Sequence, residues 1–335
     1  MQASPIRLKC STSIGATFLY GILASVFAFA CQVAFGQPYP ARPIRLVVPF
    51  PAGGGVDISA RLVGQKLAER LGGSVVVDNR SGAAGIIGTG IVARAQPDGY
   101  TLGMVAAGHT INPGLYPRLP YDAVKDFAPI SLVVLAPGIL VVGLNVRART
   151  AMEFIELARA KPGQMTFSSA GTGSPPHLAM ELLKTMMGID LIHVPYKGGA
   201  EYMADVAGGR IDATITSIAA VLPLVKSSRV RALAVSSRTR AAATPDVSTM
   251  IEAGVRGYEA VSWYGLLAPA GTPRGIVERL SAETVRVLRM DDVRERLIGQ
   301  GLEPVGNTPQ ELAARIGEEI PKWNRVIQAA GIRIE

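Results

Sequence analysis

Short apolar runs alternate with amphipathic segments along most of this chain, and this alternation restricts the fold more than any other feature. Residues 44–50 form an apolar run of strand length, and residues 58–72 repeat apolar side chains at helical spacing. Parallel sheets covered by helices have this pattern, because each strand returns through a crossover helix. The sequence therefore predicts an α/β fold.

The alternating units form two series. Strands are predicted at 44–50, 74–79, 100–107, 165–171, 191–196, 211–217, 229–237 and 259–271, and helices at 58–72, 86–95, 151–161, 177–188, 199–209, 273–290 and 309–330. Apolar, strand-like joints near residues 141–146 and 257–262 separate the series. We expect two lobes joined by two hinge crossovers, with residues 37–142 and 260–335 as lobe 1 and residues 143–259 as lobe 2.

Residues 1–36 are typical of a secretory signal peptide. Arg7 and Lys9 precede an uncharged apolar stretch at 14–35, and small residues lie at the −3 and −1 positions before Gln37. The stretch also approaches the length of a membrane span, so a retained anchor is the alternative. The polar, proline-rich sequence that starts at Gln37 favours cleavage and export.

Both cysteines, Cys10 and Cys31, lie in this leader, so the rest of the chain has no disulfide and no cysteine metal site. Phe29 stands where a lipoprotein signal has a small residue, which disfavours lipidation at Cys31. Loss of the two positive charges of the leader lowers the formal net charge from +8 to +6. The remaining positive charges are scattered, which argues against nucleic-acid binding and suits a small anionic ligand.

A glycine-rich turn follows the first predicted strand, in the sequence VVPFPAGGGVD at residues 47–57. Its three glycines let a ligand approach the backbone closely, and the helix that follows directs free N–H groups and its positive dipole end at the same point. No Gly-Lys-Ser/Thr follows, so the turn is not a P-loop. The turn predicts an anion site, in which Asp57 has the simpler alternative role of helix N-cap.

A second glycine-rich turn, SSAGTGSPPH at residues 168–177, has the same design. We expect Ser174 to be the N-cap and Pro175 the first helical residue. Hydroxyl groups that can donate to a carboxylate belong to Ser168, Ser169, Thr172 and Ser174. The turn lacks the third glycine of a dinucleotide site and does not contain Gly-x-Ser-x-Gly, so it predicts neither a dinucleotide fold nor a hydrolase.

Catalysis and metal binding have no comparable motif. The three histidines, His109, His177 and His193, do not have zinc-site spacing, and the turn aspartates are explained by turn chemistry. His109 follows the third predicted strand and could face a ligand cleft. His177 is expected in a first helical turn and His193 in the core. We therefore expect no metal, no cofactor and no enzymatic activity.

Eight stretches resemble, in order, the signature stretches of the tripartite tricarboxylate transporter receptors, also called the Bug family. They are YPARPIRLVVPFPAGGGVD, VVVDNRSGAAG, PDGYTLG, INPGLYPRLPYDAVKDFAPI, SSAGTGSPPHLAMELL, HVPYKGG, PDVSTMIEAG and WYGLLAPAGTP. Each stretch alone is a weak signal, but eight in order, from about residue 39 to the C-terminus, are specific. The resemblance implies a type II periplasmic-binding-protein fold, in which two α/β lobes close over a ligand by a hinge motion.

The resemblance also implies the ligand class and the contacts. Family ligands are mostly small carboxylates, including di- and tricarboxylates, acidic amino acids and aromatic acids. Carried over by position, the expected ligand-binding residues are Phe50, Ala52, Gly53, Gly54, Asp57, Ala107, His109, Ser168, Ser169, Thr172, Gly173, Ser174 and Ser217, with Thr216 beside them. The expected partners are the membrane permease subunits of a tripartite tricarboxylate-type transporter, and the receptor itself is expected to be a monomer.

Two other functions stay open at this point. A sensor would use the same binding chemistry but present its ligand to a signalling partner. An exported enzyme on the same scaffold would need a nucleophile with a base, and the sequence offers only His109 and hydroxyl groups for this role.

Overall fold

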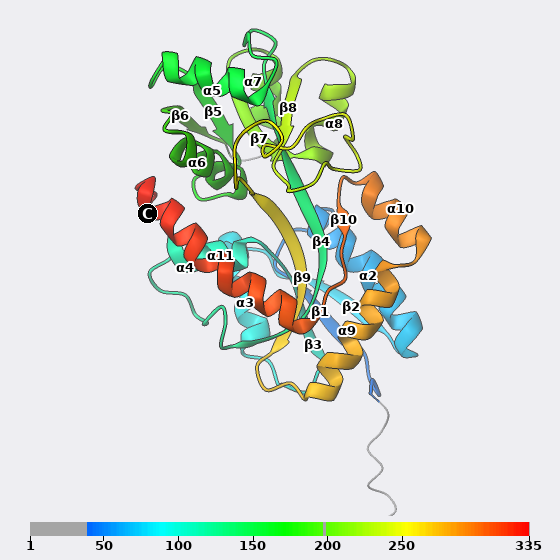
Figure 1. Ribbon diagram of the computed structural model, residues 1–335. Coiled ribbons are helices and arrows are strands. Elements are labelled where there is room, and N and C mark those ends of the chain that lie inside the picture. The colour runs from blue at the N-terminus through cyan, green and yellow to red at the C-terminus, as the bar shows by residue number, and fades with distance from the viewer. Residues whose placement is uncertain (1–38, 197–198, 335) are drawn as a thin grey trace, which may run out of the picture. The chain divides into compact units, whose positions relative to one another are not determined.

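In the computed structural model, which describes residues 39–196 and 199–334, ten strands form one mixed sheet (Figure 1). The predicted leader, with Cys10 and Cys31, lies outside the described residues. The strands are β1 (Ile44–Val48), β2 (Val75–Asn79), β3 (Thr101–Ala106), β4 (Phe127–Val142), β5 (Thr166–Ser169), β6 (Ile192–Pro195), β7 (Ala213–Ser217), β8 (Arg231–Val235), β9 (Val261–Pro269) and β10 (Glu303–Pro304). The order across the sheet is β2-β1-β3-β9-β4-β7-β5-β6, and β8 and β10 both pair with β4.

Helices cover this sheet. They are α2 (Gly55–Leu71), the short 3₁₀ turn η2 (Ala83–Gly85), α3 (Ile86–Ala93), α4 (Gly108–Leu115), α5 (Ala151–Ala160), α6 (Pro175–Met187), α7 (Gly199–Ala207), α8 (Ile218–Lys226), α9 (Arg274–Leu288), α10 (Asp291–Gly299) and α11 (Pro309–Ala329). Their ends follow local chemistry: α2 stops at Gly72, which has a φ of 69° that favours glycine, and Thr308 and Glu311 form a capping box at the start of α11.

The parallel layers that the sequence predicts occur at the two ends of the sheet. β1 pairs in parallel with β2 and β3, and β5 pairs in parallel with β6 and β7. The centre differs, because β9 is antiparallel to β3 and β4, and β4 is antiparallel to β7 and β8. The fold is therefore a curled, mixed α/β sheet that carries two lobes.

Strand β4 runs through both lobes. Its residues up to Pro137 pair with β9, and its residues from Gly138 onward pair with β7. The change of partner falls just ahead of the 141–146 joint expected from the sequence, and the other crossover enters β9 at Val261. In Figure 1, β4 and β9 run side by side between the lobe of α5 to α8 and the lobe of α2, α3 and α9.

Besides the two crossovers, helix α11 bridges the lobes by packing, because it contacts α4 in one lobe and α6 in the other (Figure 1). The buried carboxylate of Glu319, a residue of α11, accepts hydrogen bonds from Thr110 Oγ1 at 2.9 Å and Trp263 Nε1 at 2.8 Å. Glu319 therefore ties α4, β9 and α11 into one core.

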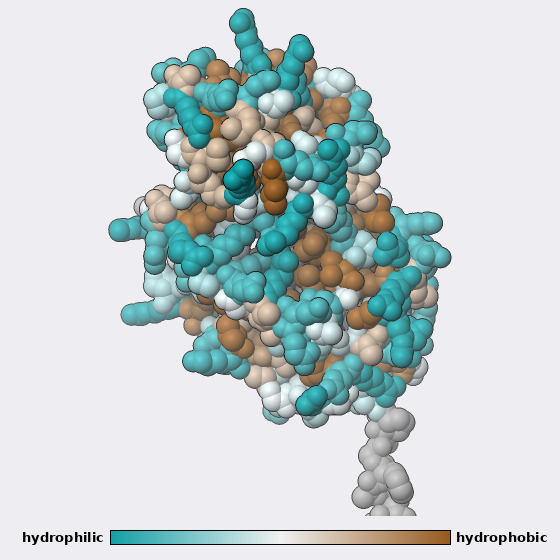
Figure 2. Space-filling view, viewed as in Figure 1, coloured by the Kyte–Doolittle hydropathy of each residue, from teal (hydrophilic) through white to brown (hydrophobic). Residues whose placement is uncertain are grey.

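The outer surface is mainly polar. Figure 2 shows hydrophilic residues over most of one face, with apolar residues in small separate patches. The large apolar side chains that are exposed, such as Val76 and Val124, come from distant parts of the chain. Among the described residues, no helix is both long enough and apolar enough to span a membrane.

Candidate ligand-binding site

The first glycine-rich turn connects β1 with α2, as predicted. The helix starts at Gly55, earlier than expected, with Gly54 as N-cap. No earlier helical residue can accept from the N–H groups of Gly55, Val56 and Asp57, so these first-turn amides point out of the helix. Gly53 to Gly55 are exposed, which leaves room for a ligand beside the amides.

Asp57 holds this turn in shape. Its side chain is 3% exposed and accepts hydrogen bonds from the Gly53 amide at 2.9 Å, Asn79 Nδ2 at 2.9 Å and Arg61 Nε at 3.0 Å. Burial alone would raise the pKa of Asp57, but these hydrogen bonds outweigh burial and lower the pKa below its usual value. Asp57 is neither the N-cap nor a free ligand contact; it is the anchor of the turn.

Tyr264 of β9 reaches the same point from the other side. A Cβ atom on Gly55 would lie 2.7 Å from the Tyr264 hydroxyl, so only glycine lets this hydroxyl approach the start of α2. Burial raises the pKa of Tyr264, which keeps the phenol protonated and able to donate a hydrogen bond. Backbone amides and a hydroxyl donor therefore meet at the start of α2.

The second glycine-rich turn, residues 168–174, uses its hydroxyl groups internally. Ser169 Oγ lies 2.7 Å from His193 Nε2, accepts from the Gly171 amide and contacts the Gly171 carbonyl, and Ser174 Oγ donates to that carbonyl at 2.6 Å. Thr172 is exposed, while Ser168 Oγ is buried without a hydrogen-bond partner. Ser169 and Ser174, expected as donors to a ligand, thus stabilise the turn.

Helix α6 begins with two prolines, which have no N–H group. Pro175 and Pro176 occupy its first positions, with Ser174 as N-cap as predicted. The start of α6 therefore offers an anion fewer backbone donors than the start of α2, and presents apolar rings instead. The turns before α2 and α6 are therefore not the two equivalent anion sites that their similar sequences predict.

A cavity of about 290 Å³ lies between the hinge strands and the second lobe. Its lining residues come from β4, α6, α7, β7, α8, β9 and the residue before β9: Ala136, Gly138, Pro175, Pro176, Ala179, Tyr202, Ile215, Thr216, Ser217, Ala220, Ala260, Ser262 and Tyr264. Tyr264 links it to the start of α2, and the exposed Ser217 caps α8 by accepting from the Ala220 amide. Thr216, beside Ser217, shares a 2.6 Å hydrogen bond with Tyr202.

The loop after β3 contributes less than the sequence suggests. Ala107 is 2% exposed and precedes α4, whose first turn contains His109. The His109 ring is buried beside Tyr121 and Phe127, and its Nε2 lies 2.8 Å from the Ala123 carbonyl. Burial lowers the pKa of His109 to about 4. The expectation that His109 could face the ligand is therefore corrected: its imidazole belongs to the core.

Comparison with known proteins identifies the family. The family model described as "Tripartite tricarboxylate transporter family receptor" matches residues 59–332. The chain belongs to this family. A UPF0065 protein from the tcbD-tcbE intergenic region of Pseudomonas sp. (strain P51) is 41% identical over 310 residues, which cover 92% of either chain.

Solved structures of similar receptors have the same two-lobe fold. Rpa4515 of R. palustris with adipate is 37% identical, covers 88% of this chain and 99% of its own, and superposes with a TM-score of 0.76. MatC of Rhodopseudomonas palustris with bound malate is 32% identical, covers 86% of this chain and 100% of its own, and has a TM-score of 0.72. Both were solved with small dicarboxylates.

Most residues that line the cavity were not predicted from the sequence. Of the predicted contacts, Ser217 and its neighbour Thr216 line it. Tyr202 lies inside an ordinary apolar helix pattern, and Tyr264 lies in the signature stretch WYGLLAPAGTP but was not predicted as a contact. The signal that could have found Tyr264 is its position in the predicted hinge strand, where side chains alternate toward the two faces.

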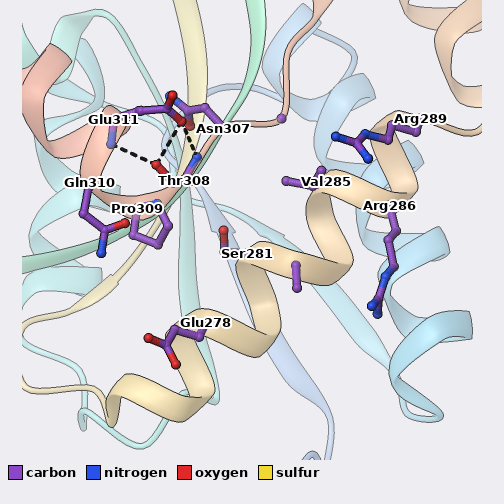
Figure 3. A pocket seen from close by; sticks show the side chains of 12 residues that line it. Glu278, Ser281, Val285, Arg286, Arg289, Asn307, Thr308, Pro309, Gln310 and Glu311 are labelled. Carbon is purple, nitrogen blue, oxygen red and sulfur yellow. Dashed lines mark hydrogen bonds between the residues drawn. The ribbon is translucent and has the colours of Figure 1, made fainter.

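Three other described pockets contain none of the predicted contacts. One, of about 520 Å³, lies between α9 and the start of α11 (Figure 3), and its residues Thr308 and Glu311 are already hydrogen-bonded to each other. Another, of about 590 Å³, follows the loop at residues 116–124. Both are lined by lobe 1 alone. The third, of about 350 Å³, has residues of both lobes in its lining, but most of them are charged, including Arg238, Glu259 and Lys322.

Proposed function

We propose that this protein is a periplasmic solute-binding receptor that captures a small carboxylate between its lobes and delivers it to the permease subunits of a tripartite tricarboxylate-type transporter. The observation that carries the proposal is the convergence of the α2 amides, the Tyr264 hydroxyl and the cavity beside Ser217. Membership of the receptor family and the adipate and malate complexes of its relatives support the ligand class.

Binding in such a site needs no cation. A hydrogen bond to a charged group contributes about 1.5–3 kcal/mol, so a few amide and hydroxyl donors with apolar packing reach about −8 kcal/mol, or micromolar affinity. None of the residues that line the described cavity is charged. The positive ends of the helix dipoles supply the favourable field.

Closure would be a rotation of lobe 2 (residues 143–259) against lobe 1 (residues 37–142 and 260–335) about the two crossovers that join them. Pro137–Gly138, where β4 changes partner, and the entry to β9 at Val261 are the positions that would absorb the rotation. Closing the lobes would exclude water from the carboxylate and so strengthen its hydrogen bonds.

A receptor fits the geometry better than an enzyme does. Ser169 and His193 are within hydrogen-bond distance, as a nucleophile and a base must be. However, Ser169 is fully buried, and its hydroxyl also contacts both the amide and the carbonyl of Gly171. The pair therefore serves the shape of the turn.

Thermal unfolding of protein stripped of carried-over ligand tests the ligand class. Adipate, malate and aromatic acids are compared with adipamide, in which amides replace both carboxylates. A ligand at a hundred times its Kd should add about 2.7 kcal/mol of stability and raise the Tm by about 4 °C. Shifts with acids and not with adipamide are expected; equal shifts with both, or none with any acid, would refute carboxylate capture.

A pair of glycine variants tests the position of the site. Gly55→Ala places its Cβ 2.7 Å from the Tyr264 hydroxyl and should weaken carboxylate binding at least tenfold. Gly275→Ala makes the same change in the first turn of α9, where a Cβ meets nothing within 4 Å, and should leave binding unchanged. Equal affinities for the two variants would move the site away from α2.

A further inference from the structure

Two stacked histidines lie directly against the second glycine-rich turn, residues 168–174. The ring centroids of His177 and His193 are 3.8 Å apart with an interplanar angle of 9°, and Phe167 stacks on His193 at 4.9 Å. His177 comes from the first turn of α6 and is 4% exposed, and His193 comes from β6. Two imidazoles distant in sequence therefore form one aromatic stack, in which His177 is buried and His193 is half-buried.

Each imidazole holds a different part of the turn. The Gly173 amide donates to His177 Nδ1 at 3.0 Å, which requires this nitrogen to be unprotonated. His193 Nε2 is hydrogen-bonded to Ser169 Oγ at 2.7 Å, and Ser169 Oγ accepts from the Gly171 amide. A proton on His177 Nδ1 would abolish the contact with Gly173.

The turn has little freedom to adjust to that loss. Gly173 is buried with a φ of 77°, and a Cβ at this position would lie 2.6 Å from Leu115 and 3.3 Å from Ile334. The turn is therefore packed between lobe-1 and C-terminal side chains on one side and the imidazole pair on the other. Its position affects Pro175 and Pro176, which follow it and line the cavity.

The charged groups that face the pair are both on α6. Glu181 Oε1 lies 3.7 Å from His177 Nε2 and 2.9 Å from Lys184 Nζ. Among the described residues, β5 contributes the uncharged Phe167 and Ser169. Burial, reinforced by charge on His177, lowers the pKa of His193 to about 4. Charging one ring thus opposes charging the other.

We propose that His177 and His193 are positioning residues for ligand capture, which hold residues 168–174 in the binding conformation only while the pair is neutral. Uptake of a proton by the pair frees the turn and weakens ligand binding, so that affinity falls as the pH falls. The inference rests on the proposed function for its ligand, but the coupling of the turn to the pair can be measured without any ligand.

The ligand-free measurement is an NMR titration from pH 7.5 to 3. The protein has only three histidines, so each imidazole can be followed individually. The Gly173 amide shift should change at the same pH as His177 or His193, and it should do so equally in the variant His109→Gln. An amide shift of Gly173 that stays constant while the pair titrates would overturn the proposal, whether or not any carboxylate binds.

The binding measurement uses adipate and malate as probes, by calorimetry over the same pH range. In the unmodified protein, Kd should rise about tenfold per pH unit below the first pKa of the pair found by NMR. In the variant His177→Asn with His193→Gln, amide groups replace the imidazole nitrogens without titrating. At pH 7.5 the Kd of this variant for the probes should be within a few-fold of that of the unmodified protein. Its Kd should not show the tenfold rise per pH unit.

His109→Gln is the matched control, because it removes the third histidine and keeps a donor for the Ala123 carbonyl. It should retain the full pH dependence. Unfolding curves at pH 7.5 verify that every variant is folded, and the single variants replace the double variant if it is not. The same pH dependence of Kd in the double variant and in His109→Gln would overturn the proposal. Failure of both probes to bind would count against the proposed function and leave the NMR result to decide this inference.

Discussion

The two glycine-rich turns look alike in the sequence but are built from different chemistry. The turn before α2 is anchored by the carboxylate of Asp57, which is buried and paired with Arg61. The turn before α6 is anchored by the neutral imidazoles of His177 and His193. The first helix starts with free amides, whereas the second starts with two prolines.

This difference separates two functions that one motif suggested. The start of α2 can donate hydrogen bonds to an anion, and its anchor remains charged well into the acidic range. The turn before α6 shapes the apolar side of the cavity, and its anchor depends on the absence of a proton. A glycine-rich turn in sequence therefore indicates close approach of the backbone, but not which group makes the contact.

The largest expected difference between the turns concerns their glycines. Gly53→Ala has only the cost of its positive φ, about 1–2 kcal/mol, because a Cβ there meets nothing within 4 Å. Gly173→Ala adds overpacking against Leu115, for a total loss of about 2–4 kcal/mol in the free energy of unfolding. Urea denaturation of both variants measures this; equal losses would show that the second turn is not tightly packed.

Removing the carboxylate anchor should have the next largest effect. Asp57→Asn leaves Arg61 without its ion pair and weakens the hydrogen bond to the Gly53 amide, so the free energy of unfolding should fall by about 1–3 kcal/mol. Denaturation at pH 7 measures the loss. If Asp57→Asn left the free energy of unfolding unchanged while Gly53 kept its conformation, the negative charge of Asp57 would not be what stabilises this turn.

Acid should affect the two turns in different pH ranges. The His193 pKa is depressed from 6.5 to about 4, so the stability it contributes declines as the pH falls through this range. The pKa of Asp57 is also lowered, so its contribution persists to below its usual pKa of 3.8. Hydrogen exchange of the Gly173 and Gly53 amides measures this difference. Between pH 6.5 and 4, the protection of the Gly173 amide should fall and that of the Gly53 amide should not. Parallel loss at both amides would remove the distinction.

The smallest expected effect concerns Arg61, whose side chain is 54% exposed. Arg61→Gln should cost less than about 1 kcal/mol, because the Gly53 amide and Asn79 still hold Asp57. Denaturation at low and high salt checks this value. A loss as large as that of Asp57→Asn would mean that the ion pair, rather than the backbone contact, fixes the first turn.

Most elements of the fold followed from hydrophobic spacing. Helix α10 was missed although it has no internal proline, and the other main misses contain helix or strand breakers. The sequence did not predict β4 as one strand, because Pro129, Pro137 and Gly138 interrupt it. The structure tolerates Pro137 because it lies where β4 changes partner. Helices α4 and α8 were missed for a similar reason, since each has an internal proline.

The site was predictable only where backbone chemistry defines it. Both turns and the helices after them were expected, but the orientation of side chains depends on tertiary contacts. Ser169 and His193 are 24 residues apart, and Gly55 and Tyr264 are 209 residues apart (264 − 55), so neither contact has a local signal. His109 turned out to be a core residue because α4 begins before it and directs its ring toward Phe127.

The most direct test of carboxylate capture is a crystal structure with the acid that gives the largest thermal shift. We expect a carboxylate oxygen about 3 Å from first-turn amides of α2, with the body of the ligand in the cavity beside Tyr264 and Ser217. A ligand bound in the groove between α9 and α11, or one that makes no contact with the start of α2, would contradict the account.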